Sequence, residues 1–317
     1  MNEKETEFFA KEGIEFTRVI ANGGFGVLYL VFSRQYQSYF ALKKIPQKKF
    51  NQAEIDCLKS LDQCNIVNLY KYYFFEDFVY MLMEYCPNDL FNLLKGNTNF
   101  TEDQMLRYMH DILIAIKACH DRNIAHNDIK PSNFLLDKYG RIKMCDFGLS
   151  RMYDEHCMSS CYRGTMLFMA PELFKKSPYN PLKADIWSIG VTFFYIATRS
   201  FPFFAADKQV YIKSLNSGIY PQFIVQNPQL RVLIQSCLQV NPESRPTIDE
   251  LLHMPYFDSY NSCAFRMKEG IRLACSQNAL NMAPSYQRLT KLSSGRCSLV
   301  PIRKPNMHNI VNKKATI

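Results

Sequence analysis

The sequence lacks the cysteine pairs that bind zinc or build a disulfide framework. Its eleven cysteines are scattered singly, without C-x-x-C spacing and without a histidine partner at zinc spacing. They therefore indicate buried or free thiols in a reducing compartment.

The sequence also lacks a hydrophobic run that could cross a bilayer. Its longest apolar stretch, residues 186–198, is too short and is interrupted by Ser188 and Gly190, so it is better explained as a buried helix. Residues 1–20 are charged and contain no hydrophobic signal core, so secretion is not expected. No transmembrane segment is predicted.

Acidic residues are nearly missing from one end of the chain. Residues 261–317 hold ten lysines or arginines but only one acid, Glu269. Residues 1–260 hold 28 charged residues of each sign, so the net charge of +9 lies in this basic tail. The body of the chain is electrically balanced, and the tail alone is basic.

The chain is 47% apolar, as a globular protein is, and its pattern changes near Pro87. Before Pro87 the alternation of apolar residues predicts strands over residues 14–20, 27–32, 39–45, 66–75 and 78–85. One helix is predicted there, over residues 51–61. After Pro87, helices are predicted over residues 101–120, 183–198, 208–217, 228–238 and 247–253. The fold class is therefore α+β, with a small antiparallel sheet domain before a larger helical one.

Residues 124–151 carry the most concentrated chemistry of the chain. Two apolar triplets in this stretch predict short buried strands, with loops on either side. The loops hold two carboxylates, an amide and an ammonium group within nineteen residues: Asp128, Lys130, Asn133 and Asp146. Carboxylate and amide oxygens are the ligands that Mg²⁺ prefers, and a lysine suits a transferring phosphoryl group. The stretch predicts a site for a divalent metal and a polyphosphate.

A glycine-rich turn lies between the first two predicted strands, and it reads Ile20-Ala21-Asn22-Gly23-Gly24-Phe25-Gly26. Glycine lets the backbone approach phosphates closely and lets N–H groups point at them. Such a turn is a weak signal alone. The lysine of Ala41-Leu42-Lys43 on the next predicted strand makes a phosphate-binding interpretation strong.

Together these motifs resemble the eukaryotic protein kinase family. The family pattern H-R-D-L-x-x-x-x-N, followed by D-F-G, is met as His126-Asn127-Asp128 to Asn133 and Asp146-Phe147-Gly148. The resemblance covers roughly residues 14–257. It implies the bilobal kinase fold, divided into an N-terminal extension (1–13), an N-lobe with one main helix (14–86), a mainly helical C-lobe (87–258) and a basic, flexible tail (259–317).

The resemblance implies a role for each polar residue of the catalytic stretch. Asp128 would accept or orient the proton of the substrate hydroxyl, and Lys130 would neutralise charge on the γ-phosphoryl group. Thr165 would contact both. Asn133 and Asp146 would bind two Mg²⁺ ions, which Mn²⁺ could replace. A lysine two residues after the catalytic aspartate is the serine/threonine form of the loop.

The resemblance also implies how ATP is held. Lys43 would bind the α- and β-phosphates, with Glu54 as its counter-charge. Gly23 and Gly26 match the second and third glycines of the family turn, whereas Ala21 replaces the first. Met83 falls at the gatekeeper position, and backbone groups at Glu84 and Cys86 would bind the adenine. Further ATP-binding residues implied by the match are Ile20, Asn22, Gly24, Phe25, Leu28, Ala41, Leu135 and Cys145.

The catalytic loop departs from the family pattern at Asn127, where most members have an arginine that binds a phosphate on the activation loop. A neutral asparagine cannot replace a bidentate guanidinium. This non-RD loop predicts that activity depends little on phosphorylation there. The candidate sites are Ser159, Ser160 and Tyr162, which could equally be unmodified residues of an exposed loop.

Two outer parts of the family pattern are also met. Asp185, in the predicted helix over residues 183–198, would reach back to the backbone of the catalytic loop. Arg245 sits where the family places the ion-pair partner of Glu172. Independent motifs in the correct order make a chance resemblance negligible.

The predicted function is transfer of the γ-phosphoryl of Mg-ATP to serine or threonine hydroxyls of proteins. The alternative is a pseudokinase or scaffold that binds nucleotide without efficient transfer, in which Ala21 and Asn127 would record the loss of catalysis. The complete catalytic set favours the enzyme. A nucleic-acid tether is not expected, because the tail lacks the alternation of aromatic and basic residues typical of single-strand binders.

The sequence gives weaker indications of the substrates, the partners and the location of the protein. Asp89 lies near the position where relatives use an acid to bind an upstream arginine, although Ser132 replaces the second acid, so substrates with upstream basic residues are expected. The tail is expected to bind an acidic partner or a regulator. Its residues 264–280 have a weak helical pattern, which fits a short packed helix, disorder, or calmodulin-like or membrane-surface binding. A calcium/calmodulin-dependent-kinase-like subfamily and a cytoplasmic or nuclear location are expected.

Overall fold

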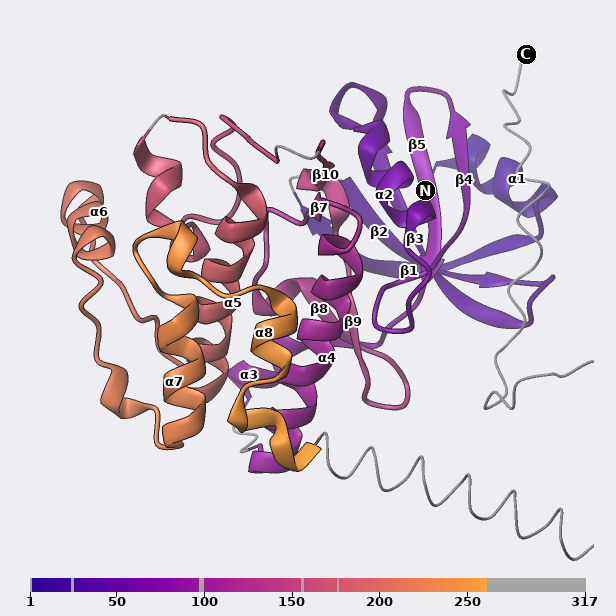
Figure 1. Cartoon of the computed structure of the whole chain (residues 1–317). Helices are drawn as coiled ribbons and strands as arrows, with labels where there is room; N and C mark the ends of the chain where they lie inside the picture. The colour runs from indigo at the N-terminus through magenta and orange to yellow at the C-terminus, as the bar shows by residue number, and fades with distance from the viewer. Residues whose placement is uncertain (1, 24–25, 97–99, 155–156, 176, 261–317) are drawn as a thin grey trace, which may run out of the picture. The chain divides into compact units, whose positions relative to one another are not determined.

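A computed structural model describes residues 2–23, 26–96, 100–154, 157–175 and 177–260 of the chain. Strands dominate the first part of the described chain and helices dominate the part that follows (Figure 1). This order confirms the predicted α+β class, with a small sheet domain before a larger helical one.

The strands of the first part form one antiparallel sheet in the order β1-β2-β3-β5-β4. The strands are β1 (Ile14–Gly23), β2 (Gly26–Ser33), β3 (Ser38–Pro46), β4 (Leu69–Phe75) and β5 (Phe78–Glu84). Successive side chains of a strand point to opposite faces of the sheet. Leu42 and Tyr80 therefore join a buried aromatic cluster on one face, whereas Lys43 and Met83 line a cavity on the other.

Two helices pack on the opposite faces of this sheet. Helix α2 (Gln52–Ser60) begins at the cap Asn51, whose side chain accepts the N–H of Ala53, and it buries Ile55 in the main core. Helix α1 (Glu3–Lys11) buries Phe9 in the aromatic cluster of the other face. The sheet is thus covered on both sides.

Helices form most of the second part of the chain. Their bounds are α3 (Leu90–Lys95), α4 (Glu102–His120), α5 (Pro181–Thr198), α6 (Lys208–Ser217), α7 (Pro228–Cys237) and α8 (Ile248–Leu252). Short strands complete it: β6 (Asn88–Asp89), β7 (Ile124–Ala125), β8 (Phe134–Leu136), β9 (Ile142–Met144) and β10 (Arg151–Met152). The predicted capping box at Thr101 is present, because its hydroxyl accepts the N–H of Gln104 and the Gln104 side chain accepts the N–H of Thr101.

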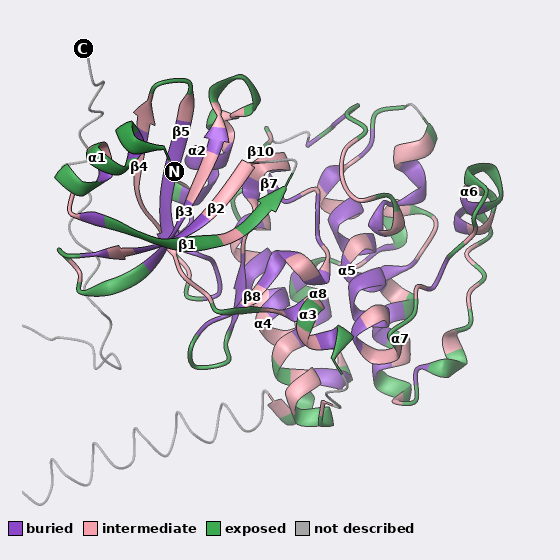
Figure 2. Ribbon diagram, turned by 180° about the vertical axis from the view of Figure 1, so that it is seen from behind, coloured by how far each residue is buried: buried purple, intermediate pink, exposed green. Residues whose placement is uncertain are grey.

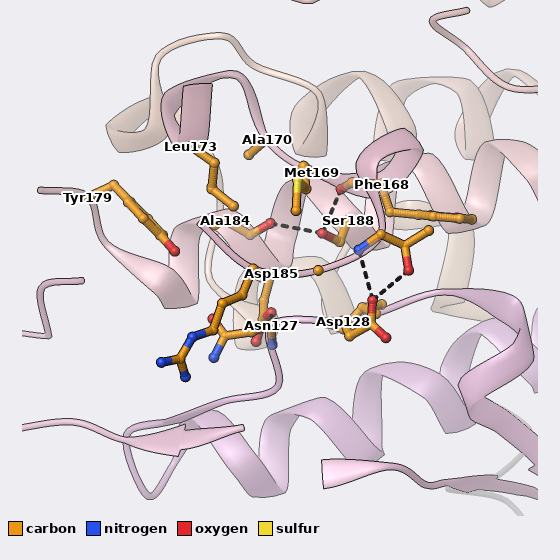
Figure 3. A pocket seen from close by; sticks show the side chains of 14 residues that line it. Asn127, Asp128, Phe168, Met169, Ala170, Leu173, Tyr179, Ala184, Asp185 and Ser188 are labelled. Carbon is orange, nitrogen blue, oxygen red and sulfur yellow. Dashed lines mark hydrogen bonds between the residues drawn. The ribbon is translucent and has the colours of Figure 1, made fainter. Parts of the chain in front are cut away.

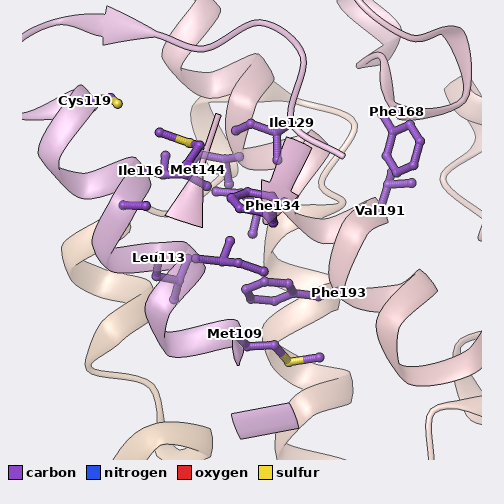
Figure 4. Close-up of a cluster of buried hydrophobic side chains, with 14 of the residues drawn as sticks. Met109, Leu113, Ile116, Cys119, Ile129, Phe134, Met144, Phe168, Val191 and Phe193 are labelled. Carbon is purple, nitrogen blue, oxygen red and sulfur yellow. The ribbon is translucent and has the colours of Figure 1, made fainter. Parts of the chain in front are cut away.

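Helix α5 lies in the core of this part and is buried along most of its length (Figure 2). Phe193 and Phe194 are fully buried, and Phe193 lies close to the α4 residues Met109 and Leu113 (Figure 4). A side chain on Gly190 would place its Cβ 2.7 Å from the Cβ of Cys237 on α7. Glycine is required there because the two helices approach too closely for any other residue.

The structure contains several elements that the sequence did not predict. They are the helices α1 and α3 and the short strands β6, β7 and β10. In addition, β4 begins at Leu69 instead of residue 66. The later start of β4 has a long-range cause, because Ile66 forms a parallel bridge with Met144 in place of a strand pair within the sheet.

The structure bears on the predictions for the tail and for membrane spans to different extents. The weak helical pattern over residues 264–280, like the rest of the tail after residue 260, lies outside the described residues. Among the helices of the described part, none is long and apolar enough to cross a membrane.

Candidate active site

A single carboxylate on α5 holds the backbone that carries the catalytic residues. Asp185 is buried and accepts the N–H groups of His126 at 2.8 Å and Asn127 at 2.9 Å. The His126 ring lies 3.0 Å from the carbonyl oxygen of Cys145 and packs edge-on against Phe147. His126 therefore supports the catalytic loop through both its backbone and its ring.

Asp128, Lys130 and Thr165 form one hydrogen-bonded group. The Lys130 ammonium donates to Asp128 Oδ2 at 2.7 Å and to Thr165 Oγ1 at 2.8 Å. The backbone N–H and the hydroxyl of Thr165 both donate to Asp128 Oδ1, at 3.0 and 2.8 Å (Figure 3). Two loops that are distant in the sequence thus bring the Asp128 carboxylate, the Lys130 ammonium and the Thr165 hydroxyl into contact.

Gly164 allows Thr165 to reach the aspartate. Its φ is +114°, and a Cβ there would lie 2.7 Å from the carbonyl oxygen of Asn127. Only glycine fits this backbone without strain, so the close approach of the two loops depends on Gly164.

Lys43 bridges two carboxylates at the inner face of the sheet. Its ammonium lies 2.7 Å from Glu54 Oε1 and 2.9 Å from Asp146 Oδ1. Burial alone would lower the pKa of Lys43, but the charges of Glu54 and Asp146 raise it above its ordinary value. Burial likewise opposes ionisation of Asp146, yet Lys43 holds the Asp146 pKa below its ordinary value. Both shifts favour the charged forms of Lys43 and Asp146, so the ion pair between them is maintained at neutral pH.

The oxygens of Asn133 and Asp146 fit a divalent metal that is also held by a polyphosphate. Both residues line the same cavity, and the amide nitrogen of Asn133 is committed to the backbone and carboxylate oxygens of Asp128, at 2.8 and 3.2 Å. The amide oxygen of Asn133 is thereby left as the ligand atom. Within the described residues, no cluster of three or more His, Cys, Asp or Glu could hold a metal by itself. Two oxygen donors match the way Mg²⁺ is bound beside substrate phosphates.

A cavity of about 590 Å³ lies between the sheet and the catalytic stretch. Most of the predicted ATP-binding residues line it, together with both predicted metal ligands: Ile20, Ala21, Gly23, Gly26, Leu28, Ala41, Lys43, Met83, Glu84, Cys86, Asn133, Leu135, Cys145 and Asp146. Its volume lies within the range of small-molecule sites. Asn22 is exposed at the end of β1, Glu54 is buried behind Lys43, and Gly24 and Phe25 lie outside the described residues.

Gly26 lines this cavity at the glycine turn. Its φ is +130°, and a Cβ there would lie 2.0 Å from the carbonyl oxygen of Lys44 on β3. The glycine turn therefore packs directly on the strand that carries Lys43.

The chain matches the model of the protein kinase domain over residues 14–257, which is more than half of its length. The chain belongs to the protein kinase family. It is 34% identical over 259 residues to calcium-dependent protein kinase 6 of Plasmodium berghei (strain Anka), covering 78% of this chain and 17% of the relative. It is 30% identical over 242 residues to sperm motility kinase 2B of Mus musculus, covering 75% and 50%.

A third relative of this kinase is the carbon catabolite-derepressing protein kinase of Saccharomyces cerevisiae (strain ATCC 204508 / S288c). It is 29% identical over 253 residues, which cover 77% of this chain and 40% of the relative. The matched region thus spans half or less of each of these three relatives. Membership of the family implies the use of ATP with a divalent metal and action on protein substrates.

The kinase replaces the usual loop arginine with an asparagine that bonds to the backbone. Asn127 adopts a φ of 64°, a region that asparagine tolerates. Its amide nitrogen donates to the carbonyl of Leu149 at 3.1 Å and to that of Ala125 at 3.3 Å. Leu149 lies just after the Asp146-Phe147-Gly148 motif, so Asn127 binds the backbone at the start of the activation segment.

The three candidate phosphorylation sites differ in exposure. Ser159 is buried and its strand-like bridge to Tyr179 uses both backbone hydrogen bonds, at 2.8 and 2.9 Å. Ser160 and Tyr162 are exposed. Ser159 is therefore the least accessible of the three to another kinase.

The activation segment runs from Asp146 to Glu172, and its far end is held by a buried ion pair. Arg245 donates to both carboxylate oxygens of Glu172, at 2.6 and 2.8 Å, and the arginine is 1% exposed. This is the partnership that the sequence match implied.

The adenine end of the cavity contains a contact that the sequence did not indicate. The N–H of Glu84 donates to the carbonyl of Asn68 at 2.9 Å, so this N–H is not available to a nucleotide. The Glu84 carboxylate accepts hydrogen bonds from the Lys143 ammonium and the Asn68 amide, both at 2.9 Å. Neither Lys143 nor Asn68 belongs to a kinase motif used above. The contacts are therefore seen only in the folded chain.

Two cysteines line the cavity, and both have a raised pKa. Burial raises the pKa of Cys86 to about 12 and also raises the pKa of Cys145. Because the thiolate is the reactive form, both thiols are expected to react slowly near neutral pH. Val67 and Phe91 also line the cavity and were not anticipated, since a single apolar residue carries no functional signal.

Proposed function

We propose that this chain is an active serine/threonine protein kinase that transfers the γ-phosphoryl group of ATP to hydroxyl groups of proteins. The observation that carries the proposal is the geometry of Asp128, Lys130 and Thr165 beside the Lys43–Glu54–Asp146 group. Every charged side chain of the site already has the partner that orients it.

The side chains divide the reaction between them. Asp128 lies where it can accept the proton as the hydroxyl oxygen of a substrate forms a bond to the γ-phosphorus and the bond to the β–γ bridging oxygen breaks. Lys130 places positive charge beside the transferring group, and Thr165 holds Asp128 in position. Lys43 would hold the α- and β-phosphates, and Glu54 keeps its ammonium in place.

The metal is proposed to be Mg²⁺, with Mn²⁺ as a substitute, held by Asn133 and Asp146. When bound, it would screen the negative charge of the phosphates. Removal of the metal by a chelator should therefore abolish phosphorylation, and Mg²⁺ or Mn²⁺ should restore it.

The decisive experiment separates this enzyme from a pseudokinase. The purified chain, with and without residues 259–317, is incubated with radiolabelled ATP, a divalent metal and generic protein substrates, beside an Asp146→Ala variant. Incorporation should exceed that of the variant by more than about 10²-fold, because the variant loses both a metal ligand and a partner of Lys43. Equal incorporation would refute the enzyme and leave nucleotide binding as the function.

Substrate and partner preferences are proposed on charge. Asp89 lines the cavity, although both of its carboxylate oxygens accept hydrogen bonds from Asn92 as the cap of α3. We propose a preference for substrates with basic residues upstream of the acceptor, and a peptide array without such selection would remove it. The ten basic residues of 261–317 support an acidic partner for the tail. A cytoplasmic or nuclear site of action is proposed on the scattered cysteines, which indicate a reducing compartment.

A further inference from the structure

Two successive lysines of β3 are held by buried carboxylates from opposite sides of the sheet. Lys43 faces the cavity and pairs with Glu54. Lys44 faces the other side and pairs with Glu5 of α1, a glutamate with 0% exposure. The Tyr80 hydroxyl on β5 also donates to Glu5, at 2.8 Å. Strand β3 is therefore clamped from both faces at the point where it carries the phosphate-binding lysine.

Helix α1 is built to deliver this glutamate. The Asn2 side chain accepts the N–H of Glu5 at 2.8 Å, and the Glu5 carboxylate accepts the N–H of Asn2 at 3.0 Å, so the helix begins with a capping box. Phe8 stacks on Phe75 of β4, with ring centres 4.4 Å apart. Phe9 packs edge-on against Tyr80 of β5.

The negative charge of Glu5 is stabilised by its hydrogen-bond donors. Burial tends to raise the pKa of Glu5, but hydrogen bonds from Lys44, Tyr80 and the Asn2 backbone hold that pKa below its ordinary value. The Lys44 ammonium also lies 3.8 Å from the centre of the Phe78 ring. Without Glu5, a largely buried ammonium would lose its counter-charge and would have to move toward water.

Lys44 connects α1 to two parts of the nucleotide site. It is the neighbour of Lys43 on the same strand, and its carbonyl is the atom that Gly26 approaches so closely that no side chain fits. A shift of the Lys44 backbone would therefore move both the phosphate-binding lysine and the glycine turn.

We propose that Glu5 is a positioning residue for nucleotide binding, which acts through Lys44 to fix Lys43 and the glycine turn. The inference deepens the proposed kinase function, because it assigns α1, which lies before the matched kinase domain, a part in the same site. The rival explanation is that α1 only stabilises the fold by covering the sheet.

The test compares three variants of the full chain: Glu5→Gln and Lys44→Met, which break the pair, and Phe8→Ala, which weakens the packing of α1 but leaves the pair intact. Binding of a fluorescent ATP analogue, the KM for ATP and kcat are measured well below the melting temperature of the least stable variant. Glu5→Gln and Lys44→Met should each weaken analogue binding and raise the KM for ATP about tenfold, since small misplacements in a site cost up to about 10²-fold. Phe8→Ala should lower the melting temperature but change both constants less than twofold.

The outcomes separate the two explanations. If all three variants lose thermal stability but bind the analogue as the wild type does, α1 is only structural and the inference is overturned. If Glu5→Gln does not fold, Lys44→Met gives the same comparison, because it removes the buried ammonium itself. A wild type that binds the analogue without transferring phosphate would contradict the proposed function, yet the binding comparison would still decide the role of Glu5.

Discussion

The ion pair between Glu172 and Arg245 offers a prediction whose size follows from the structure. Glu172→Gln keeps the shape of the side chain but removes its charge. Arg245 would then remain 1% exposed without a counter-charge, although its guanidinium would keep hydrogen bonds to the carbonyls of Gln239 and Lys183, both at 2.8 Å. The variant isolates the electrostatic part of the interaction.

Breaking a buried pair by removing one charge costs about 3–5 kcal/mol. In domains of about 150–250 residues, each kcal/mol shifts the melting temperature by roughly 2–4 °C. The expected fall for Glu172→Gln is therefore about 6–20 °C. Because Glu172 ends the activation segment, phosphorylation of a protein substrate should fall as well, even at temperatures where the variant is folded.

The assay is thermal unfolding followed by circular dichroism, with kinase activity measured on the same samples. The double variant Glu172→Leu with Arg245→Met is the control, since well-packed apolar residues can replace a buried pair at little cost. It should recover most of the lost melting temperature. A fall of less than about 2 °C in Glu172→Gln would show that Arg245 finds other compensation, and the reasoning would be wrong.

Three further predictions concern the nucleotide site, regulation and pH. Gly26→Ala should raise the KM for ATP more than about tenfold, because the added Cβ would lie 2.0 Å from the carbonyl oxygen of Lys44. A KM within twofold of the wild-type value in a steady-state assay would count against the close packing. The double variant Ser160→Ala with Tyr162→Phe should keep kcat/KM within tenfold of the wild type on a peptide substrate, since Asn127 bonds directly to the backbone at the start of the activation segment. A larger loss would show dependence on phosphorylation. The depressed pKa of Asp146 contributes stability that is present above its ordinary value of 3.8 and is lost as pH falls through the lower, folded-state value. Melting temperatures measured from pH 7 down to about 3 should therefore fall less steeply in Asp146→Asn than in the wild type, and parallel curves would contradict this.

The residues that could be predicted from sequence are those whose chemistry requires a fixed type at a fixed spacing. Asp128, Lys130, Asn133 and Asp146 form such a set, and the structure brings all four to one site. The start or end of a helix could be predicted where the neighbouring residues specify a cap. Thr101 is an example, since its capping box with a glutamine three residues later begins α4 where expected.

The features that were missed depend on partners far away in the chain. Helix α1 buries Phe9 against Tyr80, about 70 residues away, and its short, highly charged sequence has too few apolar positions to reveal a buried face. Helix α3 has six residues, fewer than two turns, so periodicity could not identify it. The Glu84–Lys143 contact joins residues 59 positions apart, and neither residue differs from a surface charge until the chain is folded.

The position of Asp185 has a consequence for how the kinase domain folds during synthesis. The backbone of His126 depends on a carboxylate 59 residues further along the chain, and Glu172 depends on Arg245, 73 residues further. During synthesis, Asp128 and Asp146 leave the ribosome long before either support exists. A nascent chain that stops before Arg245 thus contains every catalytic motif but lacks the ion pair that holds its activation segment. Catalytic competence is therefore expected to arise late in translation, after the last helices of the domain have emerged.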